Sequence, residues 1–196
     1  MPGGLEYLVT EVYTIGHSTH PIEEFIELLQ AHSIAQVIDV RTIPRSRHNP
    51  QFNSEALAAS LSSKGIVYRH MPELGGLRHA RRDSINTAWR NASFRGYADY
   101  MQTPEFQAAV QALIDLATGT PTAIMCAEAL PWKCHRSLIA DALLARGISV
   151  LDILSPTKAT LHALTPFARV NGTDVTYPGK DQENLPLKFD APEALR

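Results

Sequence analysis

The chain has 196 residues, of which 44% are hydrophobic and 19% are charged, and its formal net charge is −2 at neutral pH. This length suits one sizeable domain with a full hydrophobic core and is short for two. No apolar run approaches the roughly 20 residues that cross a bilayer, and the N-terminus lacks the pattern of a secretory signal. Two cysteines make no disulfide framework. We therefore expect a cytoplasmic protein with reduced thiols and no membrane partner.

Arginine is concentrated in one part of the chain. Thirteen of the 18 basic residues are arginine, and ten of these lie between Arg41 and Arg136. The segments 41–48 (RTIPRSRH) and 78–82 (RHARR) are locally positive. The guanidinium group can bind phosphate or carboxylate through two N–H groups at once. These segments are thus candidates for anion binding, and a solvated surface is the alternative interpretation of either one alone.

Hydrophobic periodicity divides the chain into alternating strands and helices. In chain order, the predicted strands cover 7–15, 34–40, 66–71, 121–128 and 148–154, and the predicted helices cover 20–33, 54–65, 94–101, 103–119 and 134–147. Ser18 or Thr19 is expected to cap the first helix, Ser54 the second, and Thr103 the fourth. Residues 72–93 have no sustained period, and a loop of this length is typically functional.

Strands that alternate with helices indicate βαβ units and right-handed crossovers. The prediction is an α/β fold with three α-β-α layers and a mostly parallel, Rossmann-like sheet of about five strands. Residues 1–170 are expected to form a single α/β domain, and residues 171–196 an extended C-terminal arm. A weak strand pattern at 174–178 (DVTYP) also allows a short hairpin there.

Polar residues follow four of the predicted strands, at the edge where an open parallel sheet binds its ligands. Beginning with the segment GHST (16–19), the residues after these strands bring both charged and nucleophilic side chains to this edge. The helices that follow add free N–H groups and partial positive charge. The predicted anion-binding residues are Gly16, Ser18, Asp39, Arg41, Arg45, Arg47, Glu73, Tyr97, His135 and Arg136. Asp39 is expected to pair with Arg41 or Arg47. Phosphate, alone or within a nucleotide, is the expected anion.

Cys134 is the predicted reactive thiol, because the first turn of a helix and the neighbouring Lys133, His135 and Arg136 favour a thiolate. His17 or His135 would carry the proton. Glu128 is a candidate base, although a salt bridge to an arginine is the preferred interpretation of its position. In the alternative without chemistry, Cys126 and Cys134 are small buried residues, as free cysteines commonly are.

We expect no metal ion and no cofactor. Cys126, Cys134, His135 and His17 have the donor atoms for a metal, but Cys-x7-Cys-His is not a known zinc spacing. Adjacent cysteine and histidine residues at a helix start also normally point apart. A reversible disulfide between the two cysteines remains a further alternative.

Four segments of the chain resemble one known family. They are 13–52 (YTIGHSTHPIEEFIELLQAHSIAQVIDVRTIPRSRHNPQF), 70–76 (HMPELGG), 96–107 (GYADYMQTPEFQ) and 126–143 (CAEALPWKCHRSLIADAL). In this order they are similar to the domain of unknown function 488 family of bacteria and archaea, over roughly residues 7–170. The resemblance implies an α/β domain with a shared polar site, and it implies no activity.

The combined expectation is an anion-binding, catalytic site that acts on a phosphate-bearing or nucleotide-like substrate, as a thiol- or acid/base-dependent hydrolase or transferase. Cys134, His17 and Glu128 are its predicted catalytic residues. The alternative is a nucleic-acid or nucleotide binding module without catalysis, in which arginines follow the backbone and aromatic residues such as Phe52, Trp89 and Tyr97 stack on bases. The sequence leaves the oligomeric state open.

Overall fold

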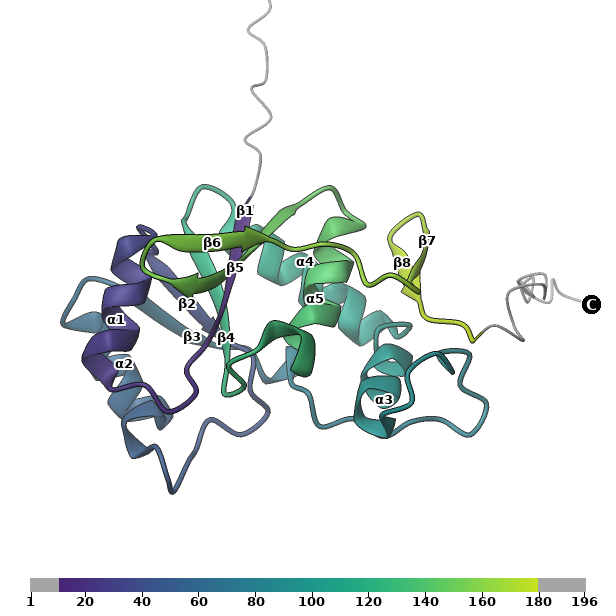
Figure 1. Cartoon of the computed structure of the whole chain (residues 1–196), viewed down its shortest axis with the longest axis horizontal. Helices are drawn as coiled ribbons and strands as arrows, with labels where there is room; N and C mark the ends of the chain where they lie inside the picture. The colour runs from purple at the N-terminus through teal and green to yellow at the C-terminus, as the bar shows by residue number, and fades with distance from the viewer. Residues whose placement is uncertain (1–10, 180–196) are drawn as a thin grey trace, which may run out of the picture.

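The computed structural model describes residues 11–179 and shows a three-layer α/β fold (Figure 1). Within these residues a six-stranded sheet has the order β3-β2-β4-β1-β5-β6, in which every pairing is parallel except β5 with β6. The strands are β1 (Glu11–Gly16), β2 (Gln36–Asp39), β3 (Val67–His70), β4 (Thr122–Cys126), β5 (Ser149–Ser155) and β6 (Lys158–Leu161). The predicted fold class is therefore confirmed, with one strand more than expected.

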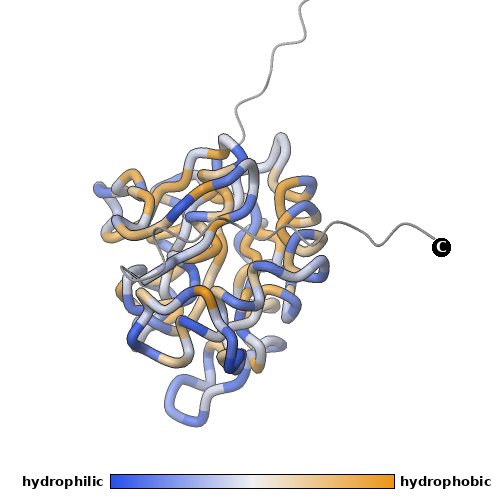
Figure 2. The backbone as a smooth tube through the Cα atoms, turned by 90° about the vertical axis from the view of Figure 1, so that its right-hand side faces the viewer, coloured by the Kyte–Doolittle hydropathy of each residue, from blue (hydrophilic) through white to orange (hydrophobic). Residues whose placement is uncertain are grey.

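Helices cover both faces of the sheet (Figure 1). They are α1 (Ile22–Ala31), α2 (Ser54–Ser62), α3 (Ala92–Tyr100), α4 (Pro104–Ala117) and α5 (Arg136–Leu144). Buried residues of α1 and α2 form one core cluster, and those of α3, α4 and α5 form the other. The helix traces alternate between hydrophobic and hydrophilic residues, as amphipathic helices packed on a sheet require (Figure 2).

Strand alternation assigns each β4 side chain to one of these two clusters. Ala123 and Met125 face α1 and α2, whereas Ile124 and Cys126 face α3, α4 and α5. Successive strand residues point to opposite faces, so this parity is fixed once the strand is in register. Cys126 consequently lies on the same side of the sheet as α5, the helix that follows Cys134 and His135.

The capping residues and first residues of the helices were predicted less well than the helices themselves. Helix α1 begins after Pro21, without the side-chain cap expected from Ser18 or Thr19, and α2 has Asn53 rather than Ser54 at its N-cap position. The Thr103 cap of α4 is confirmed, since its hydroxyl accepts a hydrogen bond from the Phe106 N–H. Helix α5 begins two residues later than predicted, at Arg136.

Three short 3-10 helices, Pro50–Phe52, Pro72–Leu74 and Pro131–Lys133, connect the larger elements. The C-terminal strands β7 (Arg169–Asn171) and β8 (Asp174–Thr176) pair as a hairpin, and the fully buried Tyr177 anchors the segment after it to the domain. The predicted division at residue 170 falls inside this hairpin. The remainder of the predicted arm, 180–196, lies outside the described residues.

Candidate active site

A cavity of about 630 Å³ opens at the carboxyl ends of β1, β2 and β4. These three strands are neighbours in the sheet, so the residues that follow them meet at one edge, as expected for a parallel sheet. Of the predicted site residues, the cavity is lined by His17, Ser18, Arg41, Arg45, Glu128 and His135. The sequence did not single out Thr42, Asn49, Leu77 and Ala129, which also line it.

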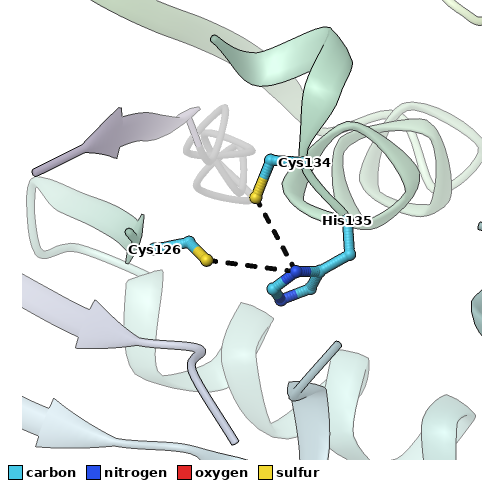
Figure 3. Close-up of side chains that lie close together, drawn as sticks. All are labelled: Cys126, Cys134 and His135. Atoms are coloured by element: carbon cyan, nitrogen blue, oxygen red, sulfur yellow. Dashed lines mark hydrogen bonds between the residues drawn. The ribbon is translucent and has the colours of Figure 1, made fainter. Parts of the chain in front are cut away.

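Two thiols and one imidazole lie close together beside this cavity, and Cys126 and His135 line it. Figure 3 shows the three side chains pointing toward one another. The Sγ atoms of Cys126 and Cys134 lie 4.0 and 3.7 Å from Nδ1 of His135. Nε2 of the same ring lies 3.1 Å from the carbonyl oxygen of Val40, and because a carbonyl only accepts, Nε2 must carry a hydrogen. Nδ1 is therefore the ring nitrogen that presents its lone pair to the thiols.

The late start of α5 explains this convergence. Cys134 is extended, with φ −128° and ψ 148°, whereas His135 already has helical angles, so the two adjacent side chains are not spread around a helical turn. The ring of Tyr97 packs against the His135 ring at 5.1 Å between centroids, and the Tyr97 hydroxyl donates to the carbonyl of Leu74. Tyr97 is fully buried and so supports His135 without lining the cavity.

The two thiols differ in their access to the cavity. Cys126 lines it and is 9% exposed, whereas Cys134 is 4% exposed and does not line it. The sequence prediction of Cys134 as the reactive thiol rested partly on a position in the first helical turn, which this residue does not occupy. It also rested on the neighbouring basic residues, and of these His135 and Arg136 do lower the pKa of Cys134. Access to a ligand favours Cys126 instead.

The pKa values of the two thiols shift in opposite directions. A hydrogen bond from Cys126 lowers the pKa of Cys134, and His135 and the positive charge of Arg136 act in the same direction against the effect of burial. The same hydrogen bond, together with burial, raises the pKa of Cys126. These opposite shifts favour the thiolate form at Cys134 and the protonated form at Cys126.

Arg136 lies beneath the site rather than in it. Its side chain is 1% exposed and donates to the Thr14 hydroxyl and to the carbonyls of Glu128 and Ala129, and its Nε is buried without a partner. Within residues 11–179 no carboxylate forms an ion pair with it. Arg136 does not line the cavity, so its side chain is not placed to bind an anion there as the sequence predicted. From the protein interior, its positive charge instead acts to lower the pKa of both thiols.

Arg41 is held in place by several groups and still reaches the cavity. It donates from Nε and Nη2 to the Asp39 carboxylate at 2.9 and 2.6 Å, from Nη2 to the carbonyl of Phe52, and from Nη1 to Nε2 of His17. The predicted Asp39–Arg41 pair is confirmed. Four of the five guanidinium N–H groups are used by these bonds, which leaves one on Nη1 for a ligand.

His17 is a neutral support for Arg41. Its Nδ1 donates to the carbonyl of Ser18 and its Nε2 accepts from Arg41, so both ring nitrogens are engaged. The ring stacks on Phe52 at 4.1 Å between centroids. Burial, with smaller contributions from Arg41 and Arg136, lowers the pKa of His17 to about 4. These contacts make His17 less suited than His135 to carry a proton.

The segment GHST packs against the loop after β4 and does not form an open anion cradle. The N–H groups of His17 and Ser18 donate to the carbonyls of Cys126 and Ala127, so they are not available to an anion. A Cβ on Gly16 would lie 2.0 Å from the carbonyl oxygen of Glu128, which explains glycine at this position. Ser18, with φ +46°, remains at the cavity through its side chain.

The remaining predicted residues lie on the rim or away from it. The Glu128 side chain is exposed at the cavity and, within residues 11–179, forms no ion pair, so its expected salt bridge is not found there. Arg45 is exposed and lines the cavity. Arg47 and Glu73 are exposed and do not line it.

Gly76 tests how strictly His135 is positioned. A Cβ at this residue would lie 2.6 Å from Nδ1 of His135, closer than a Cβ atom comes to a non-bonded atom in proteins. We expect Gly76→Ala to displace the ring and to slow modification of the thiols by iodoacetamide. The control His79→Ala, at an exposed residue of the same loop that does not line the cavity, should leave the rate unchanged. Equal rates in both variants would show that the ring position does not matter to the thiols.

Fold and site together define a three-layer α/β protein with a thiol–imidazole cluster and arginines at the carboxyl edge of its sheet. The chain belongs to the family described as domain of unknown function DUF488, whose model matches residues 21–143. The match includes Asp39, Arg41, Cys126, Cys134 and His135, and it begins after Gly16, His17 and Ser18. No curated protein and no solved structure matches the chain. No helix in the described part of the chain is long and apolar enough to cross a membrane.

Proposed function

We propose that this protein is a thiol-dependent hydrolase or transferase that binds a phosphate-bearing or nucleotide-like substrate in the cavity at the carboxyl edge of its sheet. One observation carries the proposal: the Cys126 thiol and the His135 imidazole open on the same cavity as Arg41 and Arg45. The chemistry needs reduced thiols, and both cysteines are free. A reducing compartment such as the cytoplasm therefore fits the proposal.

The substrate class follows from the cavity lining. Arg41 offers one N–H group from a fixed position and Arg45 offers an unconstrained guanidinium, a combination suited to the oxygens of a phosphate group. Ser18 and Asn49 add neutral polar groups. The volume of about 630 Å³ lies within the roughly 300–1,000 Å³ typical of small-molecule sites.

In the proposed reaction Cys126 supplies the nucleophile. Its sulfur forms a bond to the electrophilic centre of the substrate while its proton passes to the Cys134 thiolate. The bond from that centre to the leaving group breaks, and the leaving group takes the proton from Cys134 through Nδ1 of His135. Water or an acceptor alcohol then attacks the same centre, the bond to the Cys126 sulfur breaks, and Cys126 leaves as a thiolate. Glu128, at the rim, would take the proton of that second nucleophile and return it to Cys126, and His17 would position Arg41.

Two alkylating reagents of similar size and different charge test both parts of the proposal. We expect iodoacetate, an anion, to modify Cys126 before Cys134 and to be preferred over neutral iodoacetamide more strongly than with a small free thiol. His135→Gln should slow the reaction by about 10² or more, the size of effect that loss of a general base produces. Peptide mass spectrometry identifies the modified residue, and inorganic phosphate should protect it.

Arg45 and Arg47 provide a matched pair of variants, because both are exposed arginines of one loop and Arg45 alone of the two lines the cavity. Arg45→Gln should reduce the preference for iodoacetate, and Arg47→Gln should leave it unchanged. Alkylation of both thiols at the rate of a free thiol, with no preference for the anion, would overturn the proposal.

The alternative, a nucleic-acid binding module, has one observation in its favour: Trp132, in the short 3-10 helix between the two cysteines, is 62% exposed and free to stack on a base. The other expected stacking residues are unavailable, since Phe52 and Tyr97 are fully buried and Trp89 stacks on Phe94. Salt-sensitive binding of mixed-sequence oligonucleotides that survives Cys126→Ser and Cys134→Ser would support the module and contradict the thiol enzyme.

A further inference from the structure

The thiol–imidazole cluster also has the dimensions of a metal site. We propose that Cys126, Cys134 and His135 bind one thiophilic metal ion, with Zn²⁺ as the best fit. This inference goes beyond the proposed thiol function and does not depend on it. With zinc bound, both sulfurs are ligands and no free nucleophile remains, so the metal-bound and metal-free forms are alternative states of one cluster.

The distances between the donor atoms match a tetrahedral zinc ion. Zinc–sulfur and zinc–nitrogen bonds of about 2.3 and 2.1 Å, at a tetrahedral angle, place sulfur and nitrogen about 3.6 Å apart. The observed separations from Nδ1 of His135 are 3.7 Å to Cys134 and 4.0 Å to Cys126, and all three donor atoms lie within 4.8 Å of one another. The two sulfur–nitrogen separations therefore fit such an ion after shifts of a few tenths of an ångström.

The imidazole is oriented as in metal sites. Its Nε2–H donates to the carbonyl of Val40, which fixes the tautomer and directs the lone pair of Nδ1 toward the two sulfurs. Outer contacts of this kind accompany most metal-bound histidines. Two thiolates and one imidazole are soft donors that select zinc or copper(I) and disfavour magnesium and calcium, which prefer oxygen.

The fourth position of such an ion would face the cavity. Cys126 and His135 both line the cavity, whereas Cys134 closes the cluster from the protein interior. Three protein ligands with one open position is the arrangement of reactive rather than purely structural zinc sites. Arg41 and Arg45 lie on the same cavity, so an anion that they bind can supply the fourth ligand.

Cobalt(II) titration of the reduced, metal-free full-length protein tests the site directly. We expect one equivalent to bind with a sulfur-to-cobalt charge-transfer band and tetrahedral absorption, and zinc to displace it. Cys126→Ser and Cys134→Ser should each weaken binding by more than the roughly 10–100-fold that loss of an outer-shell partner costs. The control His48→Gln, an exposed histidine that contributes no ligand, should titrate as the unaltered protein does.

A second measurement on the unaltered protein avoids any doubt about the folding of variants. One equivalent of zinc should protect both thiols from iodoacetamide, and a chelator should restore their modification. Absence of the charge-transfer band, or unchanged thiol modification in the presence of zinc, would overturn the metal site. Metal binding by a protein whose metal-free Cys126 is unreactive would instead contradict the proposed thiol function and leave the metal site standing.

Discussion

Replacing Asp39 with alanine is expected to lower the free energy of unfolding by about 3–5 kcal/mol, the cost of breaking a buried ion pair from one side. Asp39 is fully buried and accepts hydrogen bonds from the Arg41 side chain, from the Arg41 backbone N–H and from the Tyr68 hydroxyl. Its loss leaves a buried guanidinium without a counter-charge. Urea denaturation followed by circular dichroism measures the change.

A second arginine–aspartate pair with the same spacing serves as the control. Arg81 and Asp83 bond bidentately, as Arg41 and Asp39 do, but both side chains are largely exposed. Exposed pairs contribute little because solvent screens them. We expect Asp83→Ala to leave the denaturation midpoint unchanged. If the two variants lost equal stability, burial of the Asp39–Arg41 pair would not be the source of its effect.

The Asp39 variant also separates stability from function. Asp39→Asn keeps an oxygen that accepts from Arg41 and should unfold at an intermediate urea concentration. Because Arg41 lines the cavity and Asp39 holds its orientation, both variants should show a weaker preference for iodoacetate over iodoacetamide in the folded protein. The control Asp83→Ala should retain the full preference.

The position of the site was predictable because it depends on topology alone. Strand alternation with helices indicated a parallel sheet, and polar residues after several strands then had to meet at its carboxyl edge. The Asp39–Arg41 pair could be predicted because a single residue separates a buried carboxylate from a long basic side chain at a strand end. The actual strand order, with β4 between β2 and β1, brings Cys126 next to Gly16 and places both beside the end of β2.

The roles of individual residues depended on details that periodicity does not contain. The convergence of Cys134 and His135 requires α5 to begin at Arg136, after the short 3-10 helix at Pro131–Lys133. Pro131 is the one local signal for that turn, since proline favours the first position of a helix. The burial of Arg136 had no such signal, because its partners, Thr14 and two carbonyls, come from distant or irregular segments.

Strand β6 was missed for a different reason. The strand has only four residues, Lys158–Leu161, and most of them are exposed, so the sequence shows neither a buried run nor a clear alternation. The strand forms because β5 presents an open edge that the returning chain can pair with. It also brings His162 beside the buried Asp141 and Asp152, a contact that no pattern in the sequence indicates.

His162 should make stability depend on pH above neutrality. Its Nε2 and Nδ1 lie 3.1 and 3.3 Å from the carboxylates of Asp141 and Asp152, which are both buried. Burial alone would lower the pKa of His162, but the hydrogen bonds and charges of the two aspartates raise it to about 9. The folded state therefore holds this proton more tightly than the unfolded state, where the pKa is near 6.5.

A raised pKa in the folded state stabilises the protein at low pH. The contribution is fully present below about pH 6.5 and is lost as the pH rises through about 9. Allowing for solvent screening of a partly accessible side chain, we expect about 2 kcal/mol of unfolding free energy to disappear across this range. His162→Gln should abolish that difference, and because the thiols titrate in both proteins, subtracting the two urea profiles isolates His162. Parallel profiles from pH 6 to 10 would mean that the His162 proton is not held by Asp141 and Asp152.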